Sequence, residues 1–255
     1  MKALSLVLGL AAIAVMVPVR AAQAQAISYD EEGRPQDFSS PQRWAIELRF
    51  GPYYPDVDAE FKGDPAVGPH QRYFGTGKRL MTQLEVDYQF FRRFGTLAAA
   101  LQVGYYSETA NSFEVGSDKR SADETSLTLF PTALSLVYRF DVAARRWSIP
   151  VVPYAKAGLS YTMWRVSDSN GNTAKSDMPG GTGRGGTLGW QAAAGASLML
   201  DFLDPGSARE LDSGSGVNHT YLFFELAHFA VDGFGKSGAL NVGDTTWLAG
   251  LMFEF

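Results

Sequence analysis

The chain has 255 residues, a formal net charge of −5 and no cysteine. This length suits one domain or a single barrel, and the lack of cysteine excludes a disulfide framework and a lipid-modified N-terminal cysteine. An acidic chain without a basic stripe argues against nucleic acid as a partner.

The N-terminal segment has the three parts of a secretory signal peptide. Lys2 supplies the positive charge, residues 4–17 are apolar, and small residues flank Gln23 and Gln25. The apolar run is too short for a good transmembrane helix. We therefore expect a signal peptide at 1–24, with cleavage after residue 24 or 26, and a membrane anchor is the alternative. The polar residues 25–42 are expected to form an extended periplasmic tail.

Eight segments follow in which large apolar residues occupy alternate positions, which is the period of a β-strand. In the first, Trp44, Ile46 and Leu48 alternate with Ala45 and Glu47. The parity of the apolar residues changes near Pro131. Because proline cannot donate to a strand ladder, we expect a bulge there. The eight segments lie at 43–54, 80–90, 96–106, 126–140, 151–164, 188–202, 220–230 and 245–255.

The volume of the apolar faces indicates which side of the strands meets lipid. An eight-stranded barrel has an interior just wide enough for side chains, so these faces cannot all point inward. Long connections after the odd strands are typical of extracellular loops. The sequence predicts an all-β fold, a single antiparallel transmembrane barrel of about eight strands at 43–255 in the bacterial outer membrane. A soluble barrel is the alternative, and the long connection 203–218 has no explanation.

The last strand carries an apolar face formed by Trp247, Leu251, Phe253 and Phe255. A strand that ends with the chain would close the barrel and remove its edge. The pattern resembles the C-terminal signature by which outer-membrane barrels are recognised for assembly. The expected partners are therefore the barrel-assembly machinery and outer-membrane lipid.

The whole mature chain resembles a small OmpA-like outer-membrane barrel. More narrowly, residues 49–58, which read RFGPYYPDVD, and residues 84–91, which read LEVDYQFF, resemble a family of outer-membrane β-barrels known mainly from myxobacteria. The resemblance implies the barrel and its location. It implies no activity and brings no catalytic residues.

Several charged residues occupy the alternate strand positions whose side chains are expected to point into the lumen. Charges in so narrow a space must pair or meet water, which favours a salt-bridged plug over a conducting pore. Carboxylates outnumber cations among them, so any leak should favour cations. The predicted lumen network consists of Glu47, Arg49, Glu85, Asp87, Arg139, Lys156, Asp201, Glu225 and Glu254.

The sequence offers little for catalysis or metal binding. An enzymatic site needs a base against a nucleophile or water, and His70, His219 and His228 show no such partner on their own segments. Residues 168–172 alternate oxygen ligands but lack the closing glutamate of a calcium loop. We predict no catalytic, cofactor or metal residues, and a non-enzymatic structural or binding role through long extracellular loops whose ligand is unknown. A narrow cation-preferring channel and a lipid-modifying enzyme are the alternatives.

Overall fold

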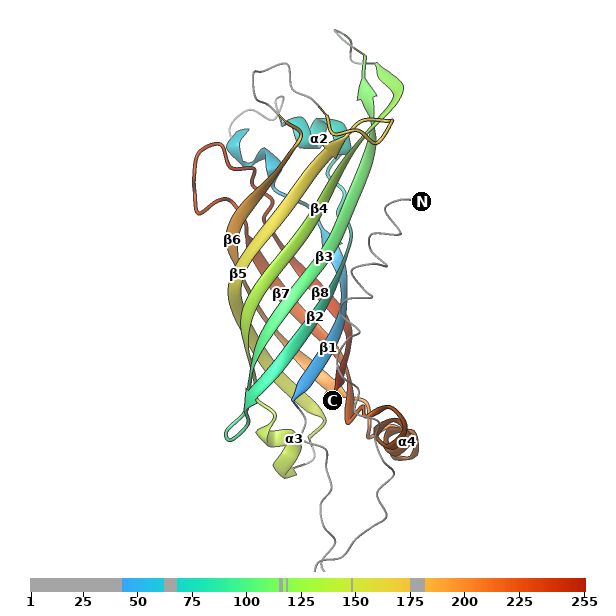
Figure 1. Ribbon diagram of the computed structural model, residues 1–255, viewed down its shortest axis with the longest axis vertical. Helices are drawn as coiled ribbons and strands as arrows, with labels where there is room; N and C mark the ends of the chain where they lie inside the picture. The colour runs from blue at the N-terminus through green and yellow to red at the C-terminus, as the bar shows by residue number, and fades with distance from the viewer. Residues whose placement is uncertain (1–42, 62–67, 115–116, 118, 148, 175–181) are drawn as a thin grey trace, which may run out of the picture.

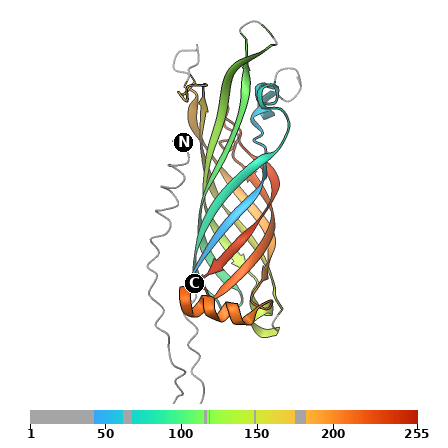
Figure 2. The ribbon, with the colours of Figure 1, turned by 90° about the vertical axis from the view of Figure 1, so that its right-hand side faces the viewer.

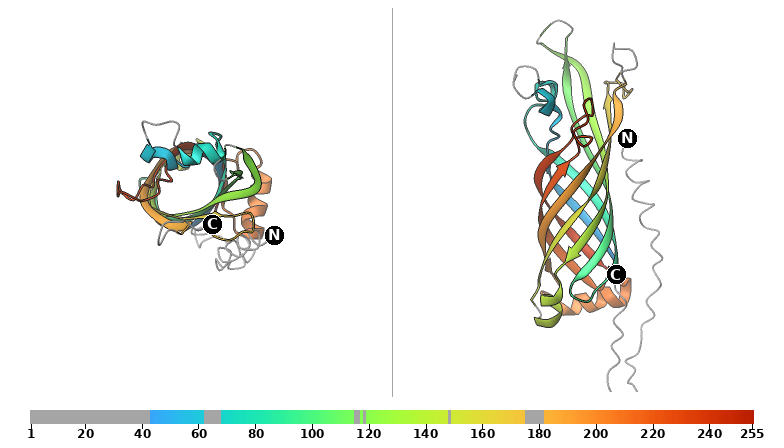
Figure 3. Two further views of the ribbon diagram at one scale, coloured as in Figure 1. Left: turned by 90° about the horizontal axis from the view of Figure 1, so that it is seen from above. Right: turned by 90° about the vertical axis from the view of Figure 1, so that its left-hand side faces the viewer.

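The fold is a closed barrel of eight antiparallel strands, in a computed structural model that describes residues 43–61, 68–114, 117, 119–147, 149–174 and 182–255 (Figure 1). Each strand pairs with its sequence neighbours, as Figure 3 shows from above. The predicted signal peptide and tail lie outside the described residues. The strands are β1 (Trp44–Tyr53), β2 (Arg79–Phe91), β3 (Thr96–Phe113), β4 (Arg120–Arg139), β5 (Val151–Ser167), β6 (Arg184–Met199), β7 (His219–Ala230) and β8 (Asp244–Glu254).

The ring closes between β1 and β8. Residues 45–50 of β1 pair with residues 249–254 of β8. Just beyond this ladder, the carbonyl oxygen of Phe255 accepts hydrogen bonds from the N–H groups of Arg43 and Trp44 at 2.8 and 3.1 Å. The prediction that the last strand closes a barrel is confirmed.

Side chains alternate between the outside and the inside of the barrel along each strand. Large apolar residues point outward, and the exposed fractions of Leu80, Leu134 and Leu159 are 64%, 63% and 64%. A continuous apolar surface of this kind belongs in lipid rather than in water. The chain is therefore a membrane-spanning barrel whose apolar faces point outward, as predicted.

The two ends of the barrel differ in their connections (Figure 1). The turn end carries Arg43, Phe255, the short β2–β3 turn and two helices, α3 (Val142–Trp147) and α4 (Pro205–Ser215). The opposite end, the loop end, carries the connections after the odd strands. These include η1 (Val57–Phe61) and α2 (Pro69–Phe74). Within the described ranges, no helix is both long and apolar enough to cross a membrane.

Helix α4 accounts for the long connection at 203–218 and lies at the turn end of the barrel (Figure 2). The Asp204 carboxylate accepts hydrogen bonds from the N–H groups of Gly206 and Ser207 at 3.0 and 3.1 Å. A hydrogen bond from the Ser207 hydroxyl, together with these two N–H bonds, holds the pKa of Asp204 below its usual value. Gly216, with φ of 74°, ends the helix. The aspartate cap, the proline in the first turn and the closing glycine were the available sequence signals.

The predicted bulge at Pro131 is wrong. Pro131 pairs with Thr162 of β5 in an unbroken register. The parity change arises because Leu127 and Leu129 point into the barrel, where they are 4% and 1% exposed. The prediction assumed that large leucines always face lipid. Gly104 makes room for the proline, since a Cβ there would lie 2.8 Å from the Pro131 ring.

Strands β3 and β4 extend well beyond their predicted ends at 106 and 126 (Figures 1 and 2). At the barrel mouth and beyond it, the hairpin is joined by cross-strand hydroxyl pairs, Ser107 with Thr128 at 3.3 Å and Thr109 with Ser126 at 3.2 Å. Because serine and threonine are polar, this stretch shows no alternation of apolar residues, and the sequence pattern did not predict the extension of the two strands. Residues 107–114 and 119–126 are named the β3–β4 projection below.

The position of Phe255 predicts a specific assembly defect. Deleting Phe255 removes the carbonyl that caps the first two residues of the barrel, whereas Phe140→Ala removes only an outward aromatic ring. We expect the deletion to lower the amount of folded barrel in membranes several-fold more than Phe140→Ala does. Heat-modifiable mobility of both variants in membrane fractions measures this. Equal losses would show that Phe255 contributes only an interfacial aromatic ring.

Candidate functional site in the barrel lumen

A cluster of charged side chains crosses the middle of the lumen. Its members lie on five strands and are each at most 4% exposed. Taking such charges out of water is costly unless each is paired. This set is named the charged cluster, and it consists of Glu47, Arg49, Glu85, Asp87, Arg139, Lys156 and Glu225.

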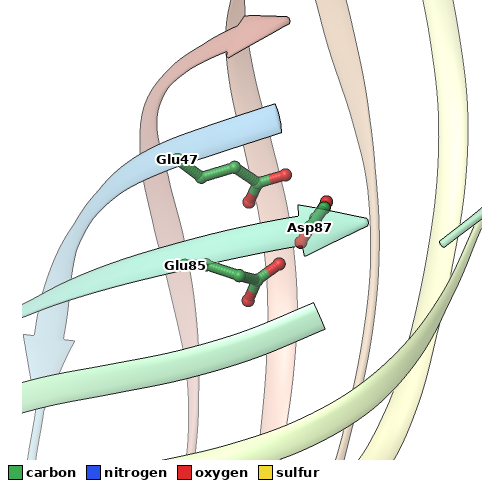
Figure 4. A group of neighbouring side chains, drawn as sticks. All are labelled: Glu47, Glu85 and Asp87. Atoms are coloured by element: carbon green, nitrogen blue, oxygen red, sulfur yellow. The ribbon is translucent and has the colours of Figure 1, made fainter. Parts of the chain in front are cut away.

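The strand register places like charges side by side. Glu47 of β1 pairs directly with Glu85 of β2, and Asp87 follows two residues later on the same face. Figure 4 shows the three carboxylates converging within the lumen. Like charges opposite each other destabilise a sheet, so this part of the wall depends on cations that reach across the barrel.

Arg49 is the central cation. Its guanidinium donates to the carboxylates of Glu85 and Glu225 and to Oε1 of Gln102, the last at 2.7 Å. Its Nε lies 3.8 Å from Oε2 of Glu47. One side chain thereby connects β1 with β2, β3 and β7 across the lumen, using the several donors of a guanidinium.

Two further cations complete the network. Lys156 of β5 donates to both carboxylate oxygens of Glu85, at 2.8 and 3.0 Å. Arg139 of β4 donates to Glu47 at 2.7 Å and to the carboxylate of Asp87. Both cations come from the neighbouring strands β4 and β5, whereas these carboxylates lie on β1 and β2, so the ion pairs cross-link the wall through its interior.

The charged cluster contains a group that could hold a metal ion. Oxygens of Glu47, Glu85 and Asp87 all lie within 4.8 Å of one another. However, Arg139 and Lys156 already donate to these carboxylates. A metal would have to displace both cations or lie against them, so the donor set fits a salt-bridge network better than a metal centre.

Two of the predicted lumen residues lie apart from the charged cluster, toward the turn end. Glu254 accepts hydrogen bonds from Gln89 at 2.6 Å and from the Tyr221 hydroxyl at 3.2 Å. Asp201 lies beyond the end of β6, where its carboxylate contacts the His219 ring. The prediction extended the alternation of strand six to 202, although the strand ends at Met199.

An apolar layer fills the lumen above the charged cluster, toward the loop end. Its buried residues come from β1, β2, β3, β4, β7 and β8 and from the connection between β7 and β8. Sequence reasoning missed this layer because it assigned large apolar residues mainly to the outside. The set is named the loop-end cluster, and it consists of Tyr53, Met81, Tyr106, Leu127, Leu129, Ala227, Phe229, Val231, Val242 and Leu248.

Helix α2 lies at the rim of the loop end (Figure 3). Its residue His70 is buried at the barrel mouth. Nε2 of His70 lies 2.5 Å from Oε1 of Glu108, and both residues are buried. Asp58 accepts a hydrogen bond from the N–H of His70 at 2.9 Å, which fixes the start of the helix. Phe74 of the same helix packs against the loop-end cluster. His70 was expected in a loop, and so short a helix has no periodicity to reveal it.

The lipid-facing histidine has a hydroxyl partner on the neighbouring strand rather than on its own. Nδ1 of His228 lies 2.7 Å from Oγ1 of Thr245, and Trp190 stands beside the ring with centroids 5.3 Å apart. His228 and Thr245 are directly paired between β7 and β8. The contact is a cross-strand pair of the kind that stabilises sheets.

The fold is similar to those of small outer-membrane barrels. Neisserial surface protein A shares 15% identity over 85% of this chain and 98% of its own, with a TM-score of 0.46. A major outer membrane protein of Thermus thermophilus shares 11% identity over 85% of this chain and 100% of its own, with a TM-score of 0.44.

The N-terminal β-barrel domain of Pseudomonas aeruginosa OprF shares 16% identity over 84% of this chain and 98% of its own, with a TM-score of 0.39. No protein-family model and no curated protein matches the chain. The resemblance to the myxobacterial family therefore stays a prediction. At these identities the likeness concerns the fold alone.

Proposed function

We propose that the protein is a non-enzymatic barrel of the bacterial outer membrane that presents the β3–β4 projection as an extracellular binding element. The observation that carries the proposal is the pair of long strands that extends this hairpin beyond a filled lumen. The outward apolar band supports the membrane location, and the distribution of connections supports an extracellular loop end.

The filled lumen weighs against the channel alternative. A permeating ion would have to part the contacts of Arg49 with Glu85 and Glu225, and then pass the loop-end cluster. Conducting barrels of this class keep a polar, water-filled interior. Here the charged cluster cross-links one layer of the interior, and the loop-end cluster makes the next layer apolar.

Helix α2, in the connection between β1 and β2, holds the β3–β4 projection in a fixed position. The Arg120 guanidinium donates to the carbonyl oxygens of Tyr73 and Arg72 at 3.1 and 2.9 Å. The same guanidinium lies over the Phe113 ring at 4.2 Å, and the Tyr73 ring contacts Phe113 with centroids 5.2 Å apart. A surface supported in this way is better suited to recognition than a free loop, because less ordering is required on binding.

A shortened hairpin tests the binding role. Residues 110–125 are replaced by Asn-Gly, which joins Thr109 to its partner Ser126 through a two-residue turn. The matched control replaces residues 234–238 of the β7–β8 connection by Gly-Ser. Cells displaying each variant are compared on arrays of extracellular glycans and matrix proteins. We expect at least one interaction of wild type to fall about tenfold in the hairpin variant alone. Identical profiles for wild type and the hairpin variant would contradict the proposal.

The membrane location has its own test. We expect the mature chain in the outer-membrane fraction, with a shift in electrophoretic mobility between heated and unheated samples, because a closed barrel satisfies its backbone groups in lipid and resists unfolding. Recovery as a soluble periplasmic protein would contradict the location.

A further inference from the structure

The outer surface of the barrel is hollowed along the β1–β8 seam. The groove has a volume of about 520 Å³, within the range of small-molecule sites. Phe50 and Leu80 line it from β1 and β2, and Trp247 and Leu251 line it from β8. Ala249 pairs with Phe50 and puts only a methyl group between the larger side chains of β8, which creates the hollow.

The loop end of the groove is cationic. Lys78 and Arg79 line it there, with side chains 38% and 44% exposed, and no carboxylate belongs to the described lining. The Lys78 ammonium is held in place by Asp244 at 2.8 Å and by the carbonyl oxygen of Thr245 at 3.0 Å. Nε of Arg79 lies 3.5 Å from Oε2 of Glu108. The groove therefore joins an apolar channel to two partly exposed cations, which carboxylates outside the lining hold in place.

We propose that this groove binds a phosphorylated lipid of the outer leaflet, an inference that rests on the membrane orientation given under Proposed function. One acyl chain lies over Ala249 between Phe50 and Trp247. The phosphate accepts hydrogen bonds from the Arg79 guanidinium and lies beside the Lys78 ammonium, which attracts it by charge. Charge-assisted contacts of this kind are stronger than neutral ones, and cationic side chains at a membrane surface attract anionic lipid.

The arrangement favours a lipid over a second copy of the chain. The lipid-facing residues that line the groove beside Ala249 are apolar, and the charges of its described lining lie at the level where the spanning strands begin. An acyl chain with an anionic headgroup has the same order of apolar and charged parts along one axis. The lipid-facing surface of a second barrel is apolar and would offer no further anionic group to Lys78 and Arg79.

Native mass spectrometry of the folded barrel in an uncharged detergent tests the inference. The probes are diphosphoryl lipid A and the same acylated disaccharide without phosphates. Ala249→Trp fills the groove, and Ala157→Trp is the matched control, because Ala157 is an exposed outward residue of β5 on another side of the barrel. Lys78→Gln removes one cation, and Lys236→Gln in the β7–β8 connection is its control. Each variant is first checked for heat-modifiable mobility.

We expect wild type to retain diphosphoryl lipid A about tenfold better than the dephosphorylated probe, a ratio that corresponds to about 1.4 kcal/mol. Ala249→Trp should lower retention several-fold and Lys78→Gln should reduce the preference for phosphate, with both controls unchanged. Equal retention of the two probes, or no effect of Ala249→Trp, would overturn the inference. A dimer that Ala249→Trp abolishes would assign the groove to a second copy instead. If Ala249→Trp fails to fold, the preference of Lys78→Gln for the phosphorylated probe tests the inference: an unchanged preference would overturn it. These results are independent of the hairpin test.

Discussion

Arg49→Ala is expected to destabilise the barrel by about 3–5 kcal/mol, because it leaves buried carboxylates without their main partner. Arg49 donates to Glu85, Glu225 and Gln102, and all these residues are almost fully buried. Lys156 would then be the remaining cation on Glu85. The measurement is the free energy of unfolding in urea, for barrels refolded into lipid vesicles.

Two comparisons separate charge from packing in this experiment. Lys78→Ala breaks a partly exposed ion pair with Asp244 and should cost at most about 1 kcal/mol. The double variant Arg49→Met with Glu85→Gln keeps much of the volume and removes the charge of one carboxylate that has lost Arg49, so it should recover part of the loss. If Arg49→Ala costs no more than Lys78→Ala, the charged cluster does not hold the barrel together.

Gly250→Ala is expected to impair closure of the barrel. A Cβ at Gly250 would overlap the carbonyl oxygen of Leu48 on β1 and would lie 2.9 Å from the Phe223 ring. The first obstacle is backbone in the closing ladder, so the two strands must separate. Overpacking of this kind costs about 1–3 kcal/mol or more. The yield of folded barrel and its urea midpoint measure the effect.

The matched control for closure is Gly185→Ala on β6. A Cβ there would meet the side-chain ring of Trp164 rather than a backbone atom, and the ring can turn away. Its folded yield should stay close to wild type. Equal losses at the two positions would mean that strands of this barrel tolerate no added methyl group anywhere, and that the seam is not special.

The barrel could be predicted from the sequence because its outward faces repeat one simple rule. Alternation from Trp44 to Leu48, and again from Trp247 to Leu251, indicates a β-strand, identifies the outward side chains and shows that they face lipid. The same parity placed Glu47, Arg49 and Glu85 inside. Which of them touch could not be predicted, because contacts across a lumen depend on strand stagger rather than on position along one strand.

Other features of the structure break the alternation rule or lie outside it. Leu127 and Leu129 point inward because the loop end of the lumen is apolar. Beyond the barrel mouth the β3–β4 projection pairs through hydroxyl groups, such as Thr109 with Ser126, and this leaves no apolar period. Helix α2 is too short to show periodicity, and α4 carries only its capping residues as a signal. His70 could be placed only by seeing where α2 lies at the barrel mouth.

Single-channel current through the wild-type barrel in planar bilayers tests the central claim most directly. The central claim is that the charged cluster and the loop-end cluster together close the lumen. We expect long records without steady conductance for wild type. In Arg139→Ala, water enters beside Glu47 and Asp87 while the loop-end cluster remains, so we expect only brief, cation-preferring openings. A large, stable conductance of the wild-type barrel would contradict the closed lumen and favour a channel over a binding element.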